Sequence, residues 1–490
     1  MPEMPELLGT DYQVARFLIE RGLGVLYLIA FVVAARQFPA LAGEKGLEPA
    51  PRFLAATTFW QAPSIFRIRY SDRLLVAAAW TGALLALAIV IGLPQQAPIP
   101  VTMLAWFVMW VLYQSISNIG GSFYSFGWET LLLEAGFLAI FLGNAEVVPP
   151  LLVILAFRWL AFRVEFGAGL IKLRGDQCWR DLTCMDYHHE TQPMPNPLSW
   201  YFHHLPRSFH RIETLGNFVA QLALPFTLFL PQPFASIGAL LMTGSQLYLV
   251  VSGNYAWLNW VTIVVLCSGI ADPVVAALGI ADPAPLPSPP TWFMVAVIGL
   301  AAVIVVLSYR PVRNLLSPNQ AMNASYDPFR LVNTYGAFGS VTRTRYEVVV
   351  EGTDAPDPND QAAWREYEFI GKPGDPRRLP PQVAPYHLRL DWLMWFLPLS
   401  RFYGEGWFVP LLTRLLEGDP PTLALLRHNP FPDRPPSFIR ARLFKYRYTT
   451  WRERRETGAW WHREPAADFV PPLRLGAGVP AASPSLSEAG

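Results

Sequence analysis

The stretch from 174 to 214 combines two cysteines with most of the histidines of the chain. Five of the eight histidines fall within it. The side chains here that could do chemistry are Asp176, Cys178, Trp179, Arg180, Asp181, Cys184, His188 and Glu190. Such residue types form disulfides, ligate metal ions or transfer protons. Three prolines follow Gln192 and exclude a long helix, so we expect a folded extramembrane loop over 174–214.

The two cysteines of this loop leave three interpretations open. A separation of six residues permits a Cys178–Cys184 disulfide, which would suit an oxidising compartment. The alternative is two reduced, packed thiols. A zinc site built from both cysteines with His188 and His189 is the third, although the spacing matches no familiar ligand pattern and adjacent histidines fit one tetrahedral ion poorly.

Lys172 lies just before this loop, at the end of an apolar stretch. Burial lowers the pKa of an amine, so a lysine at this depth could act as a catalytic base. The alternatives are a lysine that extends its ammonium group to the interface, or one that pairs with Glu165 or Asp176.

The composition of the chain predicts that a bundle of membrane helices positions these residues. Of the 490 residues, 52% are hydrophobic and only 15% are charged. A soluble chain carries about 25% charged residues, so the deficit indicates lipid surroundings. The net charge of +1 gives no reason to expect a nucleic-acid partner.

Continuous apolar runs, rather than alternating ones, predict helices across the bilayer. The candidate stretches are 17–37, 74–93, 101–118, 128–143, 149–173, 215–231, 234–251, 254–271 and 291–308. We therefore expect an α-helical multi-pass membrane bundle of about eight spans over 1–310. If 234–271 forms two spans, the 38–73 loop, the 174–214 loop and the C-terminal part lie on one side of the membrane, and the count of basic residues in the loops predicts that this side is cytoplasmic.

Several of these stretches contain charged residues, which should face the bundle interior and pair. We expect structural pairs such as Arg158 with Glu134 or Arg163 with Glu129. The alternative is that these groups line a polar cavity for a substrate.

After residue 310 the sequence indicates a soluble α+β domain over 311–475, followed by a disordered tail over 476–490. Strands are expected at 342–351, 364–370 and 440–449 from their β-branched and aromatic residues. The Trp- and Leu-rich segments 386–399 and 405–416 predict helices that lie against the membrane surface. The phosphate-binding, nucleophile-elbow and HExxH motifs are missing from the sequence.

Several strings of the chain resemble the lipase maturation factor family. They are Gly43–Gly46, Phe126–Glu129, Gly175–Cys184, Tyr187-His188, Glu190–Pro193, Pro195–Pro197, Val332–Gly339, Arg345–Glu347, Glu351–Thr353, His428–Phe431 and Trp460-Trp461 with Arg463. The resemblance implies a non-enzymatic membrane protein that assists the folding and assembly of secreted lipases, with membrane lipid and a client protein as its partners.

In that family the C-terminal domain lies in the lumen of the endoplasmic reticulum and contacts the client, which conflicts with the orientation from charge. Carried over to this chain, the client-binding residues are Asn333, Tyr335, Gly336, Phe338, Gly339, Arg345 and Glu347. The Ala-, Arg- and Pro-rich composition indicates a prokaryotic member, which would reside in the bacterial inner membrane. This interpretation implies no cofactor and no metal.

A second resemblance supplies an enzyme hypothesis. Gly169–Leu173, followed by Asp176 and Trp179, is similar to the segment of vitamin K-dependent γ-carboxylases that carries the catalytic lysine. On this alternative, Lys172 deprotonates a lipid-soluble hydroquinone. The sequence departs from that pattern in Ile171 before the lysine and in extra residues between Asp176 and Trp179.

Overall fold

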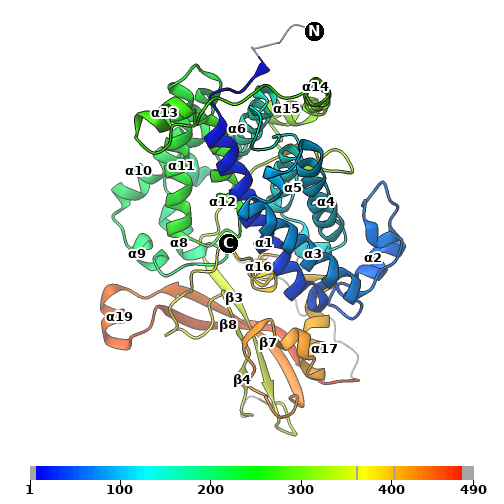
Figure 1. Ribbon diagram of the computed structural model, residues 1–490. Helices are drawn as coiled ribbons and strands as arrows, with labels where there is room; N and C mark the ends of the chain where they lie inside the picture. Colours follow the sequence, from blue (N-terminus) through cyan, green and yellow to red (C-terminus); the bar gives the residue numbers. More distant parts are fainter. Residues whose placement is uncertain (1–6, 360–361, 401–403, 477–490) are drawn as a thin grey trace.

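The computed structural model describes residues 7–359, 362–400 and 404–476, and it has two main parts. A bundle of helices occupies residues 13–316, and a strand-containing part follows it. Figure 1 shows the sheet formed by β3, β7 and β8 beneath one end of the bundle, with α16 and α17 close to it. The C-terminal part therefore lies at one face of the bundle.

Six helices in the described residues are long and apolar enough to cross a membrane. They are α1 (Gln13–Ala42), α3 (Asp72–Ile91), α4 (Ile99–Asn118), the run Arg207–Phe229 that starts as α10, α11 (Phe234–Ser252) and the run Thr291–Leu316 that contains α14 and α15. Together with the strands that follow, they establish a multi-pass membrane protein with a β-containing C-terminal region.

The expected count of about eight spans is not confirmed, because three apolar stretches form other kinds of helix. The stretch 128–143 forms α5 (Gly127–Ala139), which has 13 residues, and the stretch 254–271 forms α12 (Leu258–Leu266), which has nine. Both helices are too short to span the membrane. The third, α6 (Leu151–Arg174), has 24 residues but carries three arginines, a glutamate and Lys172. These three helices pack against one another at the centre of the bundle, where protein rather than lipid surrounds their polar groups.

Close packing around α1 holds the bundle together. Figure 1 shows α1 running through the middle of the molecule. Tyr27 and Phe31 of this helix are fully buried and meet the ring of Tyr113 edge-on. A side chain on Gly82 of α3 would come within 2.4 Å of the Phe31 ring, so this glycine is what lets α3 approach α1 closely.

Short elements connect the long helices. The extramembrane loop expected over 174–214 contains α7 (Gln177–Arg180), α8 (Met185–Thr191), α9 (Ser199–His203) and the first part of α10 (Arg207–Phe218). Two further short helices of the bundle are α2 (Ala50–Ala56) and α13 (Asp272–Ala277), and the last spanning run consists of α14 (Thr291–Leu307) and α15 (Tyr309–Leu316). A π-helical turn at Val219–Ala223 follows α10, opposite α6.

The C-terminal sheet has four antiparallel strands in the order β4-β3-β7-β8. The strand β3 (Arg345–Thr353) pairs with β7 (Phe438–Tyr448) from Arg345 opposite Tyr446 to Thr353 opposite Phe438. The first and third predicted strands are therefore confirmed. The second, 364–370, is divided into β4 (Arg365–Glu366) and β5 (Glu368–Phe369), and β5 pairs with β6 (Leu426–His428) in a separate sheet.

The strand β8 (Trp461–Leu473) was not predicted, because its three prolines are typical of a loop. A further pair, β1 (Ala324–Ser325) and β2 (Asn333–Thr334), lies between the bundle and the main sheet in sequence. The predicted helices correspond to α16 (Arg389–Phe396) and α17 (Phe408–Glu417), and α18 (Pro420–Leu423) and α19 (Trp451–Thr457) complete the domain. Residues 390–394 of α16 are buried in protein, contrary to the expected position on the membrane surface.

Candidate functional site between the bundle and the C-terminal domain

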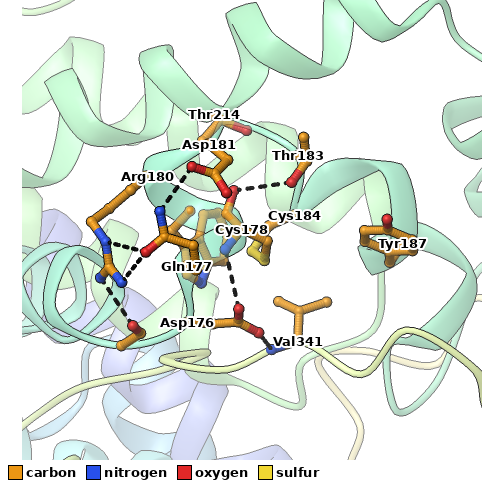
Figure 2. The surroundings of a disulfide bond; sticks show 12 residues. Asp176, Gln177, Cys178, Arg180, Asp181, Thr183, Cys184, Tyr187, Thr214 and Val341 are labelled. Atoms are coloured by element: carbon orange, nitrogen blue, oxygen red, sulfur yellow. Dashed lines mark hydrogen bonds between the residues drawn. A yellow bond between two sulfur atoms is a disulfide. The ribbon is translucent and has the colours of Figure 1, made fainter. Parts of the chain in front are cut away.

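The two cysteines of the extramembrane loop lie at bonding distance in the structure, with their Cα atoms 4.8 Å apart. Figure 2 shows the pair beside α7, where the carboxylate of Asp176 accepts a hydrogen bond of 3.1 Å from the backbone N–H of Cys178. Both sulfur-bearing residues are buried. Because Cys178 and Cys184 contact each other, the structure favours the disulfide among the three interpretations of this loop.

Asp176 fastens the loop to the C-terminal part of the chain. Its two carboxylate oxygens accept hydrogen bonds of 2.8 Å from the guanidinium of Arg343. These bonds hold the pKa of the Asp176 carboxyl well below its usual range. Its backbone N–H also donates to the carbonyl of Gly339 at 2.8 Å. The indole N–H of Trp179 donates to the carbonyl of Phe338 at 2.9 Å, so loop and domain share several hydrogen bonds.

The other predicted loop residues divide into two groups. Arg180 and Asp181 are exposed and bond locally, Arg180 to the carbonyls of Leu173 and Gly175 and Asp181 to Gln177. His188 and Glu190 instead face inward, as the next contacts show.

The Nε2 atom of His188 lies 2.9 Å from the Tyr255 hydroxyl, and burial lowers the pKa of this histidine to about 3. The carboxylate of Glu190 accepts a hydrogen bond of 2.7 Å from the backbone N–H of Tyr448 on β7, and burial raises its pKa. His189 contacts Glu213 rather than the cysteines. The zinc site formed by the two cysteines with His188 and His189 is therefore not the arrangement found.

Lys172 is buried at the end of α6, and its ammonium group reaches neither predicted partner directly. It donates to the side-chain oxygens of Asn217 at 2.9 Å and Gln221 at 2.8 Å. Glu165 joins the same network through Gln221. The Trp179 ring centroid lies 5.2 Å from the Lys172 nitrogen. The lysine is thus held by amide oxygens and an aromatic ring.

The predicted ion pairs of the bundle are wrong in their partners. Arg163 pairs with Glu134, not with Glu129. Arg158 donates instead to the backbone carbonyls of Ser268 and Leu228, both at 3.0 Å. Charge patterns in the sequence indicated that these groups would be paired inside the bundle but could not identify which neighbour each would meet.

The segment 333–339, predicted to contact a client, lies against the bundle. The Glu134 carboxylate accepts hydrogen bonds from the backbone N–H of Asn333 at 3.0 Å, its side-chain amide at 2.8 Å and the Tyr335 hydroxyl at 2.7 Å. A side chain on Gly336 would come within 2.9 Å of the Met322 carbonyl oxygen, and one on Gly339 within 3.1 Å of an Ile171 carbon. This segment therefore packs with little free space.

Arg345 and Glu347 of β3 are also buried at this boundary. The guanidinium of Arg345 contacts the Glu347 carboxylate at 2.6 Å and donates to three loop carbonyls, those of Glu190, Gln192 and Pro193. Lys372 contacts the same carboxylate at 3.0 Å. One arginine thus joins the extramembrane loop to the first strand of the sheet.

Sequence reasoning missed two residues of this boundary, Lys372 and Arg389. The guanidinium of Arg389 contacts the Glu129 carboxylate at 2.7 Å, and both side chains are fully buried. The one signal was an isolated arginine in the Trp- and Leu-rich segment 386–399. The site as a whole is a buried polar boundary that links α5, α6, the 174–214 loop and the C-terminal sheet.

Comparisons with known proteins give a consistent assignment. Residues 14–277 match the model of the lipase maturation factor transmembrane domain, and 331–471 match that of the lipase maturation factor C-terminal domain. The chain is 40% identical to lipase maturation factor 1 of Mus musculus, over 96% of this chain and 89% of that protein. It is also 40% identical to the Bos taurus protein of the same name, over 96% and 93% of the two chains.

The Homo sapiens lipase maturation factor 1 is 39% identical, over 95% of this chain and 88% of that protein. No solved structure matches the chain. Both domain models match in the expected order, and the relatives are similar over almost the full length. The chain therefore belongs to the lipase maturation factor family.

Proposed function

We propose that this chain is a membrane-bound maturation factor that assists the folding and assembly of exported proteins, with lipases as the first clients to test. The names of its relatives support this role. On this proposal, residues 1–310 form the transmembrane domain and 311–475 the client-binding domain.

The observation that carries the proposal is the fixed position of the C-terminal sheet at the end of the bundle. Buried contacts from Glu129 to Arg389, from Glu134 to Asn333 and from Arg345 to the 174–214 loop hold it there. Buried pairs of this kind are costly to break, so they fix one geometry. A sheet fixed at the membrane can retain a client while the client folds.

The predicted client-binding residues act on this view by positioning the domain. Asn333, Tyr335, Arg345 and Glu347 are buried, so we assign the direct contacts to the exposed middle of β8. Among the described residues, β8 is paired with β7 alone, and residues 464–468 of β8 are exposed. An unpaired strand edge offers backbone groups to an extended segment of another chain.

We place the C-terminal domain and the Cys178–Cys184 disulfide on the exported side of the membrane. Disulfides persist in the lumen of the endoplasmic reticulum and in the bacterial periplasm, and are rare in the cytosol. The host compartment would then be the endoplasmic reticulum membrane or, for a prokaryotic member, the inner membrane.

Site-specific photo-crosslinking tests this function. A photo-reactive amino acid at Ala466 of β8 should form an adduct with a co-expressed lipase, and expression of the chain should raise the secreted lipase activity. The matched control is the same amino acid at the exposed Ala56 of α2, which should form none. Unchanged lipase activity with correctly inserted protein would overturn the role in lipase maturation, and an adduct from Ala56 alone would overturn the assigned surface.

One observation favours the γ-carboxylase-like alternative: Lys172 is buried without a carboxylate in direct contact. The fit to a quinone is poor, because the Lys172 nitrogen is already held by two amide oxygens. Lys172 also lines neither of two surface pockets, one at β7–β8 and one near α2. We therefore derive no reaction through this cofactor. Lys172→Met should keep lipase secretion within twofold of wild type, with the exposed Lys45→Met as control. A folded Lys172→Met protein without activity would favour the enzyme.

A further inference from the structure

The helices α8 and α10 each contain a carboxylate and an imidazole that lie three positions apart and face the other helix. On α8 these are Asp186 and His189, and on α10 they are His210 and Glu213. Residues three apart on a helix lie on the same face. Since the two helices contact each other, the four side chains meet between them.

The pairs cross from one helix to the other. His189 Nε2 lies 2.9 Å from an oxygen of Glu213, and His210 Nδ1 lies 3.0 Å from an oxygen of Asp186. One ligand atom from each of His189, His210 and Glu213 falls within 4.8 Å of the other two. The side chains of these three residues are at most 6% exposed, so they are shielded from bulk water, whereas that of Asp186 is 21% exposed.

The hydrogen bonds of His210 require a positive species at its Nδ1 atom. Its Nε2 atom lies 3.1 Å from the carbonyl oxygen of Phe202, and a carbonyl only accepts, so Nε2 carries the hydrogen. The lone pair of Nδ1 would then face the carboxylate of Asp186, which repels it unless a proton or a metal ion lies between them.

Two more polar atoms of this cluster are buried without a hydrogen-bond partner. They are Nδ1 of His189 and Oε2 of Glu213. An unpaired buried carboxylate oxygen is costly, so Oε2 of Glu213 indicates a missing ligand. The Tyr248 hydroxyl donates to Glu213 at 2.7 Å, in the way that outer groups orient the ligands of metal sites.

We propose that Asp186, His189, His210 and Glu213 bind one divalent transition-metal ion, with zinc as the favoured ion. Imidazole and carboxylate groups suit zinc, which takes four ligands at about 2.0–2.1 Å in tetrahedral geometry. Such ligand atoms lie about 3.3 Å apart, so side-chain shifts on the order of 1–2 Å would bring His189, His210 and Glu213 around one ion. Asp186 would join them as the fourth ligand from its position 3.0 Å from His210 Nδ1.

Four protein ligands make the site structural rather than catalytic. The ion would tie α8 of the extramembrane loop to α10 of the bundle. This site shares only His189 with the one considered from the sequence, because its other ligands are Asp186, His210 and Glu213 rather than the two cysteines and His188. It does not depend on the identity of any client.

Metal analysis of the full-length chain in detergent tests the proposal. The protein is stripped with a chelator, reloaded with Zn²⁺, desalted and analysed for bound zinc by mass spectrometry. We expect about one zinc per chain for wild type and less than one-tenth for Glu213→Gln and for His210→Ala. Reloading with Co²⁺ should give the visible absorption of a tetrahedral site. Tyr248→Phe should weaken zinc binding about tenfold or more.

His462→Ala is the matched control, because His462 is an exposed histidine beside a glutamate on β8, and it should bind as much zinc as wild type. Glu213→Gln keeps the size of the side chain, so it remains informative if His210→Ala does not fold. Wild-type protein that retains no zinc and shows no Co²⁺ absorption would overturn the proposal and leave a proton between Asp186 and His210. Equal zinc in wild type and Glu213→Gln would overturn it as well.

Discussion

Glu129 of α5 and Arg389 of α16 are 260 residues apart in the chain, and their side chains meet at 2.7 Å with no exposure to solvent. The same guanidinium donates to the carbonyl of Phe123, and the Tyr113 hydroxyl donates to the carboxylate of Glu129. The bundle supplies the anion and the C-terminal domain supplies the cation. This one contact therefore couples the stability of the two parts.

Arg389→Met should destabilise the protein by about 3–5 kcal/mol, because it leaves the Glu129 carboxylate buried without its cation. The loss would be measured as the free energy of unfolding in denaturant, in detergent micelles. The double variant Glu129→Gln with Arg389→Met should lose less than Arg389→Met alone, because no unpaired charge is left.

The exposed pair of Arg414 and Glu417 provides the control for this measurement. Arg414→Met should change the unfolding free energy by less than about 1 kcal/mol, as is usual for surface pairs. A similar small effect for Arg389→Met would show that the buried pair does not hold the two parts together.

How far the sequence predicts this structure depends on the range of the interactions. Apolar length identifies α1, α3, α4, α11 and the helix before Arg310, because each element is specified by its own residues. The partner of Arg163 is not predictable in this way. Glu129 and Glu134 both lie on α5 and are equally plausible partners from the sequence, and only the packing of α5 on α6 selects Glu134.

The same limit applies to the candidate site. The sequence identified the 174–214 loop and the segment 333–347 as unusual, and the structure brings them into contact through Arg345 and Asp176. The sequence also suggested a disulfide from local spacing, which is a short-range property. The sequence could not predict that Arg389 completes the boundary, because its partner Glu129 lies on a helix more than 200 residues earlier. The strand β8 was missed because its pairing to β7 outweighs its three prolines.

Counting the thiols that react under denaturing conditions tests the disulfide. Both sulfur atoms are buried, so the protein must be unfolded before a maleimide can reach them. The chain has three cysteines, and we expect one maleimide per chain without reductant, at Cys267, and three after reduction. Mass spectrometry of the intact protein gives the number directly.

Cys178→Ser serves as the control for this count, because it frees Cys184 and should give two maleimides per chain with or without reductant. Closing a loop of this size stabilises a protein by about 2 kcal/mol in the chain-entropy estimate, so this variant should also unfold more readily. Three maleimides on unreduced wild type would contradict the disulfide and remove its support for an exported loop.

Acid should destabilise the protein through His188. Burial lowers the pKa of this histidine from its ordinary value of about 6.5 to about 3. Between these values the unfolded chain binds a proton that the folded chain does not, so stability falls as the pH falls. The expected loss from this group is about 1.4 kcal/mol per pH unit below pH 6.5. Unfolding free energies at pH 7.5, 6 and 5 measure it.

His188→Gln should remove this share of the pH dependence, because glutamine does not titrate and can still bond to the Tyr255 hydroxyl. His462→Gln, at an exposed position on β8, should leave the pH dependence of wild type unchanged. Equal pH dependence in wild type and His188→Gln would show that the imidazole of His188 is solvated in the folded protein.

Gly336 tests whether close packing at the boundary is needed for lipase maturation. A Cβ atom there would lie 2.9 Å from the Met322 carbonyl oxygen, and a backbone atom cannot move away as easily as a side-chain end. Gly336→Ala should therefore cost about 1–3 kcal/mol and lower lipase secretion in proportion. Gly216→Ala on α10 is the matched control, because no atom lies within 4 Å of its added carbon. It should leave secretion unchanged and stabilise the helix by about 0.5–1 kcal/mol. If Gly336→Ala secretes as much active lipase as Gly216→Ala, the close packing of Gly336 on Met322 is not required for maturation.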